Sequence, residues 1–68
     1  MKGKNRWLAA QRVLNGLSQE EAAREIGISQ TALSDFECGR RAPSVKVAKK
    51  IAAIFDFAWT RFYEEDKP

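Results

Sequence analysis

The stretch Gly16–Arg41, GLSQEEAAREIGISQTALSDFECGRR, decides the fold, and within it the pair Ser-Gln occurs at 18–19 and again at 29–30. Serine is favoured just before a helix, because its hydroxyl oxygen accepts a hydrogen bond from a free backbone N–H of the first turn. The two serines therefore predict two consecutive helices. Helix capping does not require the glutamines, so their recurrence needs a second explanation.

The first of these helices has both a start and a stop signal. Ser18 and Glu21 have the spacing of a capping box, in which each side chain accepts a hydrogen bond from the backbone of the other residue. Gly27 supplies the positive φ at which a helix ends at low cost. We predict a helix from Ser18 to about Ile26.

The second helix is expected to begin after Ser29 and to end at Gly39. At about 100° per residue, one side of it is apolar and carries Ala32, Leu33 and Phe36. The opposite side carries short polar groups, namely Gln30, Thr31, Ser34, Asp35 and Cys38. A merely solvated helix more often carries Glu and Lys, so this composition indicates a recognition surface.

The rest of the chain also has helical periodicity, without the alternation typical of strands. A helix at about Asn5–Asn15 would bury Trp7, Ala10, Val13 and Leu14. A helix at Val45–Phe55, capped by Ser44 after Pro43, would bury Val47, Ala48, Ile51, Ile54 and Phe55. A fifth helical turn is expected at Trp59–Tyr63. We predict an all-α, compact five-helix domain covering 1–68, with a helix-turn-helix at about 18–38 and an aromatic C-terminal segment at 56–68.

Composition excludes several classes of protein. A chain of 68 residues has room for one small core, and no apolar run approaches the roughly 20 residues needed to cross a bilayer. One cysteine and no histidine leave neither a disulfide nor a typical zinc site, and general acid-base catalysis lacks its usual groups. We expect a cytoplasmic protein that is not an enzyme, with no cofactor, metal or small-molecule ligand. Nothing indicates a signal peptide.

Positive charge is concentrated in two segments. Residues 1–17 carry four basic residues and no acid, and residues 39–50 carry five basic residues and no acid, whereas residues 18–38 carry five acids against Arg24. Two basic segments brought to one face would suit a polyanion. Solvated helix faces would explain the same pattern.

The order of these features resembles the Cro/C1-type family of phage repressors, also called the XRE family. The resemblance lies in Gly-Leu-Ser-Gln, two acids, Ala, Gly, Ile-Ser and Gly-Arg with a nearby Pro, and it extends from about Asn5 to Phe57. It implies a bacterial or phage transcription regulator that binds double-stranded DNA through the helix-turn-helix.

The resemblance also implies roles for individual residues. Gln19 matches a glutamine whose backbone amide meets a DNA phosphate and whose side chain contacts the first glutamine of the recognition helix, here Gln30. Gln30 and Thr31 match base-reading positions, and a glutamine amide can pair with the N6 and N7 edge of adenine. Without DNA contact, these residues would simply be solvated at the helix start. In this interpretation the repeated Ser-Gln combines a helix cap with a pair of contacting glutamines.

Further residues follow on the same face. Ser34 and Asp35 are candidate base-reading residues, and Asp35 either accepts from a cytosine N4 or acts by excluding wrong sequences. Arg40 and Arg41 match phosphate-contacting positions, and Lys4 in the basic N-terminus is a further candidate phosphate ligand. The alternative for the two arginines is that they are exposed loop residues.

Other matches are structural. Arg12 and Glu37 match an ion pair that joins the first helix to the third, so Arg12 is not expected to bind DNA. Ala22 and Gln11 stand where larger aliphatic residues are common, and Trp7, Leu14 or the aromatic tail would compensate for the thinner core. Cys38 is expected to be a small, partly buried residue at the helix end rather than a redox sensor.

The aromatic tail has two interpretations. Phe55, Phe57 and Phe62 could complete the core, or Phe57, Trp59, Phe62 and Tyr63 could form an isologous homodimer interface. A dimer would bind a pseudo-palindromic operator and act as a repressor, and it would be associated with the nucleoid when bound. Its activity would be controlled by its own concentration, by competition with a second regulator, by proteolysis or by a protein antagonist. The alternative is an antitoxin or anti-repressor that uses the same fold to bind a protein partner.

Overall fold

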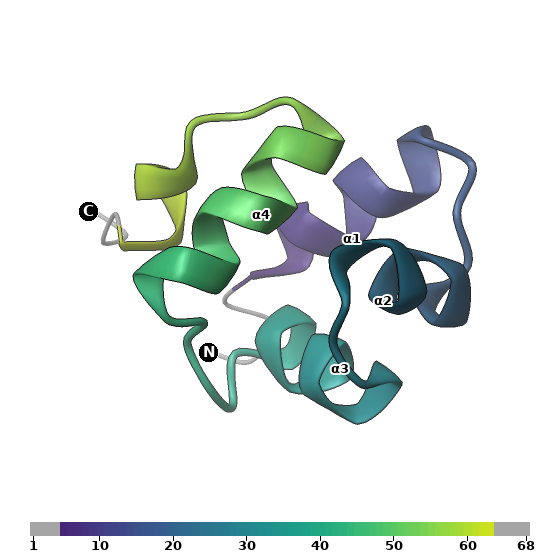
Figure 1. Ribbon diagram of the computed structural model, residues 1–68, viewed down its shortest axis with the longest axis horizontal. Coiled ribbons are helices and arrows are strands. Elements are labelled where there is room, and N and C mark those ends of the chain that lie inside the picture. The colour runs from purple at the N-terminus through teal and green to yellow at the C-terminus, as the bar shows by residue number, and fades with distance from the viewer. Residues whose placement is uncertain (1–4, 64–68) are drawn as a thin grey trace.

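The computed structural model describes residues 5–63 and, in that range, contains only helical elements (Figure 1). These are α1 (Arg6–Leu14), α2 (Gln19–Ile26), α3 (Gln30–Cys38), α4 (Val45–Phe55) and the 3₁₀ helix η1 (Trp59–Tyr63). The all-α prediction is confirmed. The predicted count of five helices is not, because the described chain has four α-helices and its last element is a 3₁₀ helix of 5 residues.

Serine caps start three of the four α-helices, as the sequence predicted. The hydroxyl oxygens of Ser18, Ser29 and Ser44 accept hydrogen bonds from backbone N–H groups three residues later, at N–O distances of 3.1, 3.0 and 3.2 Å. Gly27 and Gly39 end α2 and α3 in the left-handed conformation, with φ of 89° and 80°. Such φ values strain residues that carry a Cβ, which accounts for glycine at both positions.

The capping box of α2 is complete, because the Ser18 backbone N–H also donates to the Glu21 carboxylate at 2.9 Å. Hydrogen bonds from the backbone and then the hydroxyl of Ser18 lower the pKa of Glu21. A carboxyl with a lowered folded-state pKa stabilises the fold above its unfolded pKa, and this contribution is lost as the pH falls through the folded value.

The stabilising effect of Glu21 should therefore depend on pH. We expect Glu21→Gln to be less stable than the wild type at neutral pH and to approach it as the pH falls below about 4.3, the unfolded pKa. Urea unfolding of both proteins between pH 7 and 3 measures the difference. Because glutamine can also close a capping box, a difference that stays constant with pH would show that the charge of Glu21 contributes nothing.

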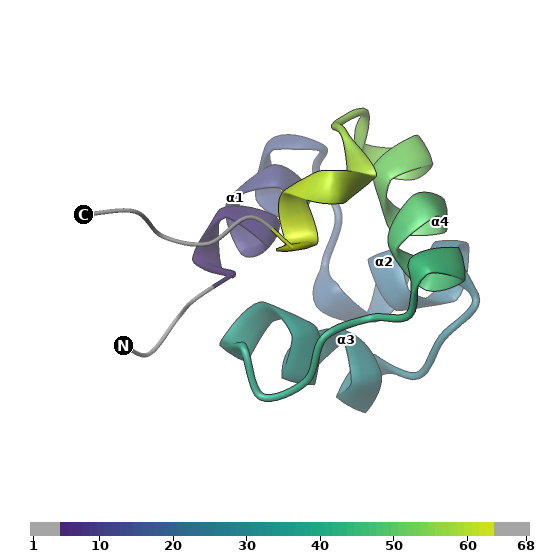
Figure 2. The same cartoon turned by 90° about the vertical axis from the view of Figure 1, so that its left-hand side faces the viewer.

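The hydrophobic core lies between all five elements. Leu8, Leu33 and Ile51 are its largest fully buried side chains, and Ala22, Ile26, Phe36 and Phe55 surround them. The predicted apolar stripe of α4 is confirmed, since Ala48, Ile51 and Phe55 are buried and Val47 and Ile54 pack against the core. Figure 2 shows α4 and η1 on the side of the core away from α3.

The predicted buried side of α1 is only partly right, because Trp7 packs against the core but the other three predicted residues do not. Val13 is 64% and Leu14 78% exposed, and Ala10 is also exposed, so Leu14 cannot compensate for the small Ala22. The side that faces the core instead carries Asn5, Leu8 and Arg12. Asn5 Nδ2 donates to the carbonyl oxygen of Phe36 at 2.9 Å. Leu8 and two polar residues with tertiary partners therefore set the rotation of α1, and a count of apolar positions could not detect the two polar ones.

Aromatic rings from the two ends of the described chain pack together. Trp7, Phe57 and Phe62 have pairwise ring-centroid distances of 5.0, 5.2 and 5.6 Å. The guanidinium of Arg61 lies 4.4 Å from the Trp7 ring centroid and covers the cluster. Trp7 and the aromatic tail thus add to the hydrophobic core.

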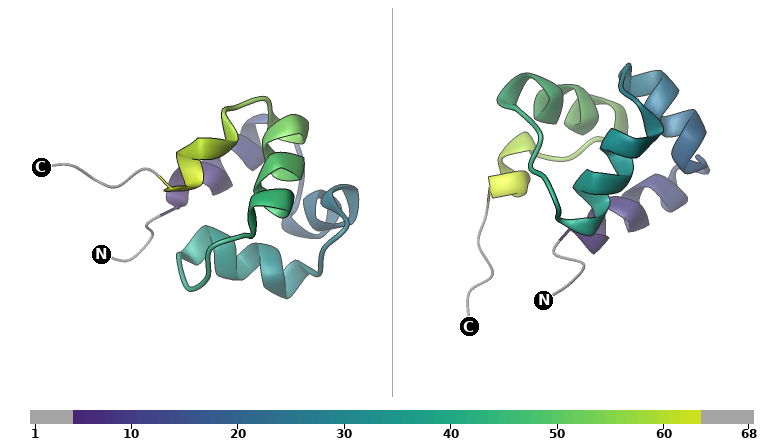
Figure 3. Two further views of the ribbon diagram at one scale, coloured as in Figure 1. Left: turned by 60° about the vertical axis from the view of Figure 1, so that its left-hand side comes forward. Right: turned by 90° about the horizontal axis from the view of Figure 1, so that it is seen from below.

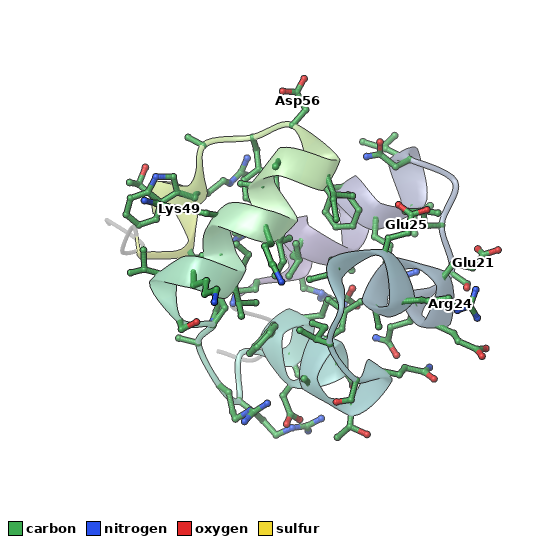
Figure 4. The ribbon with its side chains drawn as sticks, viewed as in Figure 1. Glu21, Arg24, Glu25, Lys49 and Asp56 are labelled. Atoms are coloured by element: carbon green, nitrogen blue, oxygen red, sulfur yellow. The ribbon has the colours of Figure 1, made fainter. Side chains whose placement is uncertain are left out.

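The rings of this cluster pack within one chain, and the homodimer interface expected from the tail stays a prediction. Phe62 is only 6% exposed and Phe57 is half-buried against the core, which agrees with the alternative interpretation. Trp59 is half-buried and has the Lys49 ammonium 5.1 Å from its ring centroid, and Figure 4 shows Lys49 beside the C-terminal element. The side chain of Tyr63 lies outside the described set. An interface built on Phe62 would require the core to open.

Candidate nucleic-acid interface

Helices α2 and α3 form the predicted helix-turn-helix, with a three-residue connection at 27–29. Leu33 and Phe36 hold α3 on the core by its apolar side, whereas Gln30 and Thr31 are exposed and Ser34 and Asp35 are half-buried on the other. The left panel of Figure 3 shows α3 along the lower side of the molecule, and the right panel, seen from below, shows it toward the viewer. The predicted apolar and polar sides of α3 are thus confirmed.

The two repeated glutamines contact each other. Gln30 Nε2 donates to Gln19 Oε1 at 3.3 Å, across eleven positions of sequence. Each glutamine is the first residue of its helix, so the short connection brings the N-terminal turns of α2 and α3 together. The predicted meeting of Gln19 and Gln30 is confirmed as a contact of the free protein.

A third residue sets the direction of this contact. Gln19 Nε2 donates to Glu37 Oε1 at 3.0 Å. A carboxylate only accepts, so it holds the Gln19 amide nitrogen and directs Gln19 Oε1 toward Gln30. Gln30 must then approach with its own Nε2, leaving its Oε1 and one N–H toward solvent. Sequence reasoning did not find the contact between Glu37 and Gln19, because it joins residues 18 positions apart on different helices.

The same carboxylate forms the predicted ion pair with Arg12. Arg12 Nε donates to Glu37 Oε2 at 2.8 Å and a second guanidinium nitrogen lies 3.4 Å from Oε1. Arg12 also donates to the carbonyl oxygen of Leu17 at 3.0 Å. The side chains are 15% and 7% exposed, so the pair is largely removed from water. Glu37 therefore connects α1 and the α1–α2 loop to the glutamine pair.

A shallow, open depression of about 270 Å³ lies over this face. Its lining consists of Gln19, Gln30, Thr31, Ser34, Asp35 and Arg40. All four predicted base-reading residues and two of the four predicted phosphate ligands therefore share one surface. Such an open, polar surface suits the edge of a macromolecule better than an enclosed small molecule.

Arg40 and Arg41 follow α3 and both contact Asp35. Arg40 Nε lies 3.0 Å from Asp35 Oδ1, and Arg41 Nε lies 3.4 Å from Oδ2. The hydrogen bond to Asp35 raises the pKa of Arg40, and the charges of Cys38 and then Asp35 add to this. Both arginine side chains remain more than half exposed, at 63% and 57%. They can present positive charge to solvent while Asp35 orients them.

The comparisons with known proteins agree with this geometry. A family model described as Helix-turn-helix matches residues 8–61. The chain belongs to the Cro/C1-type helix-turn-helix family of transcription regulators. In the terms of this family α3 is the recognition helix, and the resemblance noted from the sequence is confirmed.

Relatives of this helix-turn-helix protein occur in bacteria, archaea and a phage. An uncharacterized HTH-type transcriptional regulator of Bacillus subtilis, YqaF, is 40% identical over 60 residues, which is 88% of this chain and 79% of the relative. An uncharacterized HTH-type transcriptional regulator of Methanocaldococcus jannaschii, MJ0272, is 41% identical over 44 residues, which is 65% of this chain and 67% of the relative. The ImmF control region 10 kDa protein of Bacillus phage phi105 is 45% identical over 40 residues, 59% of this chain and 44% of that protein.

Some predicted features of the helix-turn-helix surface differ in the structure or lie outside it. Cys38 is exposed, so the expectation of a partly buried residue is wrong. Lys4 lies outside the described residues. The α4 lysines Lys46, Lys49 and Lys50 are exposed. Within residues 5–63, no helix has the length and hydrophobicity required to span a bilayer.

Proposed function

We propose that the protein is a sequence-specific transcription regulator that binds an operator in double-stranded DNA and represses by occluding the promoter. The observation that carries the proposal is the Gln19–Gln30 contact, inside an open depression on the exposed side of α3. In this arrangement Gln30 keeps both an acceptor and a donor for an adenine edge, while Thr31 and Ser34 read neighbouring base pairs. The regulator acts in the cytoplasm, on the nucleoid.

Phosphate contacts would hold the recognition helix in the major groove. The first turn of α2, at Gln19, offers backbone N–H groups and partial positive charge. Arg40 and Arg41 lie at the other end of α3, where their exposed side chains reach the flanking backbone. The single domain spans 1–68 in this proposal, and Lys4 adds a further phosphate contact.

We further propose that the regulator binds as a homodimer. Two recognition helices about 34 Å apart would read two half-sites one helical turn apart. Since Phe62 is buried, the dimer surface must use residues that are exposed in one copy, such as Val13 and Leu14, which are 64% and 78% exposed. The relative from Bacillus phage phi105 is named as a control-region protein, which is consistent with a regulatory role.

Selection of bound duplexes from a random library tests the function directly. The expected result is a pseudo-palindromic motif with half-site centres about 10 base pairs apart. Recovery of a motif with a single half-site would support sequence-specific binding but contradict the homodimer. Absence of any enriched motif would contradict the specific regulator.

Arg41→Ala should weaken binding to all DNA sequences alike. Because each phosphate contact releases counterions, we expect the slope of log K against log salt to become shallower by about 1 and the selected motif to stay unchanged. Fluorescence anisotropy at several salt concentrations measures this. Arg24→Ala, which removes an exposed arginine paired with Glu20 on the outer side of α2, is the matched control (Figure 4). A loss confined to one base position would show that Arg41 reads sequence.

The exposed Val13 and Leu14 also favour a second candidate, an antitoxin or anti-repressor that binds a protein. Exposed large aliphatic neighbours at a helix end are suited to a protein contact. Purification of a stable complex from the native host, together with undetectable DNA binding by the free chain, would favour this candidate. Motif selection by the free chain would favour the regulator.

A further inference from the structure

Asp35 occupies an unusual position for a residue on a DNA-reading surface. It lies on the exposed side of α3, in the same depression as Gln30 and Thr31, and its side chain is 22% exposed. Each carboxylate oxygen contacts a different arginine, Oδ1 with Arg40 and Oδ2 with Arg41. Base readout by Asp35 would have to share carboxylate oxygens that the arginines already engage.

The backbone fixes the same arrangement. The carbonyl oxygen of Asp35 accepts from the Arg40 N–H at 2.9 Å and lies 3.4 Å from the Arg41 nitrogen. The Arg41 guanidinium also stacks over Phe36, 5.5 Å from the ring centroid. Asp35 therefore holds both arginines by its backbone and its side chain, on a loop that follows the αL residue Gly39.

This carboxylate has the chemistry of a DNA phosphate. Both groups are anions that accept hydrogen bonds from guanidinium N–H groups. The Nε atoms of Arg40 and Arg41 are engaged with Asp35 in the free protein. A DNA phosphate must either use the remaining guanidinium nitrogens or displace Asp35, and in both cases it meets the field of the carboxylate. Two positive charges and one negative charge leave this cluster with a net charge of +1 rather than +2.

We propose that Asp35 restrains the phosphate contacts of the two arginines: it competes with DNA phosphates for Arg40 and Arg41 and so holds down the sequence-independent part of DNA binding. At an operator the same competition applies, and contacts by Gln30 and Thr31 supply the base-specific affinity. On other sequences those contacts are missing and the competition remains. The inference rests on the proposed function, and it gives Asp35 a role other than reading a base.

The test compares Asp35→Asn with the wild type in two binding assays, one with the operator that the wild type selects and one with mixed-sequence genomic DNA. Asparagine keeps the shape of the side chain but not its charge. We expect affinity for mixed-sequence DNA to rise about fivefold, with a steeper salt dependence. Operator affinity should rise by a similar factor, so the ratio of operator to mixed-sequence affinity should stay about the same.

Asp56→Asn is the matched control, because it makes the same change of charge at the end of α4, on the opposite side of the molecule from α3 (Figure 4). If both variants raised the affinity for mixed-sequence DNA by the same factor, only net charge would matter and the inference would be overturned. The inference would also be overturned if Asp35→Asn left that affinity unchanged but relaxed the preference at one base pair, because Asp35 would then read a base. Thermal unfolding of each variant checks that binding is compared between folded proteins. If the wild type binds no DNA, the proposed function itself fails, and the inference fails with it.

Discussion

Arg12→Met is expected to lower the free energy of unfolding by about 3 kcal/mol or more, because it leaves the Glu37 carboxylate without its cationic partner in a largely buried place. Only the amide of Gln19 would still donate to that carboxylate. A chain of 68 residues has a total stability of about 3–10 kcal/mol. The variant should therefore lose between about a third and all of its stability. Urea denaturation followed by circular dichroism measures the change.

Two companion variants identify the cause. Arg24→Met breaks the ion pair between Arg24 and Glu20, whose side chains are 70% and 73% exposed, respectively. This substitution should change the free energy of unfolding by less than about 0.5 kcal/mol. The double variant Arg12→Met, Glu37→Met removes both charges and should recover much of the loss, since apolar replacement of a whole buried pair is often neutral. A double variant that is as unstable as Arg12→Met alone would show that packing, not the unpaired charge, caused the loss.

Gln30→Ala should weaken operator binding by about 1–3 kcal/mol, roughly 5- to 150-fold, and should relax the preference at one base position. The physical reason is that alanine supplies neither the acceptor nor the donor that the Gln19–Gln30 contact directs outward. Binding to mixed-sequence DNA should change little. Anisotropy with the selected operator, and with operators substituted at each base pair, measures both effects.

Gln11→Ala is a matched control for this substitution, since Gln11 lies on α1 and does not line the depression. It should leave operator binding unchanged. Gln19→Ala should reproduce part of the loss of operator affinity and of base preference caused by Gln30→Ala, because Gln30 would lose the partner that orients its amide. If Gln30→Ala weakened operator and mixed-sequence DNA equally, Gln30 would be a backbone contact and the assignment of a base reader would be wrong.

Local signals in the sequence were reliable where the determining contacts were also local. Ser18, Ser29 and Ser44 cap their helices because a cap needs only a hydroxyl and a backbone N–H three residues away. The bounds of α4 were predicted at Val45–Phe55 and are found there, because a long apolar stripe specifies both the helix and its buried side. The aromatic tail was ambiguous, since composition does not say whether rings pack inside one chain or between two.

The rotation of α1 shows where such reasoning failed. Counting apolar residues placed Val13 and Leu14 in the core, whereas Asn5 and Arg12 face it because their partners lie on α3. A buried polar residue costs little once it is hydrogen-bonded, and the partner that satisfies it is distant in sequence. The positions of Cys38 at the surface and Phe62 in the core likewise depend on packing between elements.

The sequence by itself determined the helices, their caps, the helix-turn-helix and the family, because these depend on residues within a few positions of one another or on a matched pattern. Only the tertiary structure decided how the polar groups are oriented. Glu37 directs Gln19 toward Gln30, and Asp35 holds Arg40 and Arg41. The physical reason is that a hydrogen bond has a direction, and which group donates and which accepts is fixed by neighbours that the folded chain brings together.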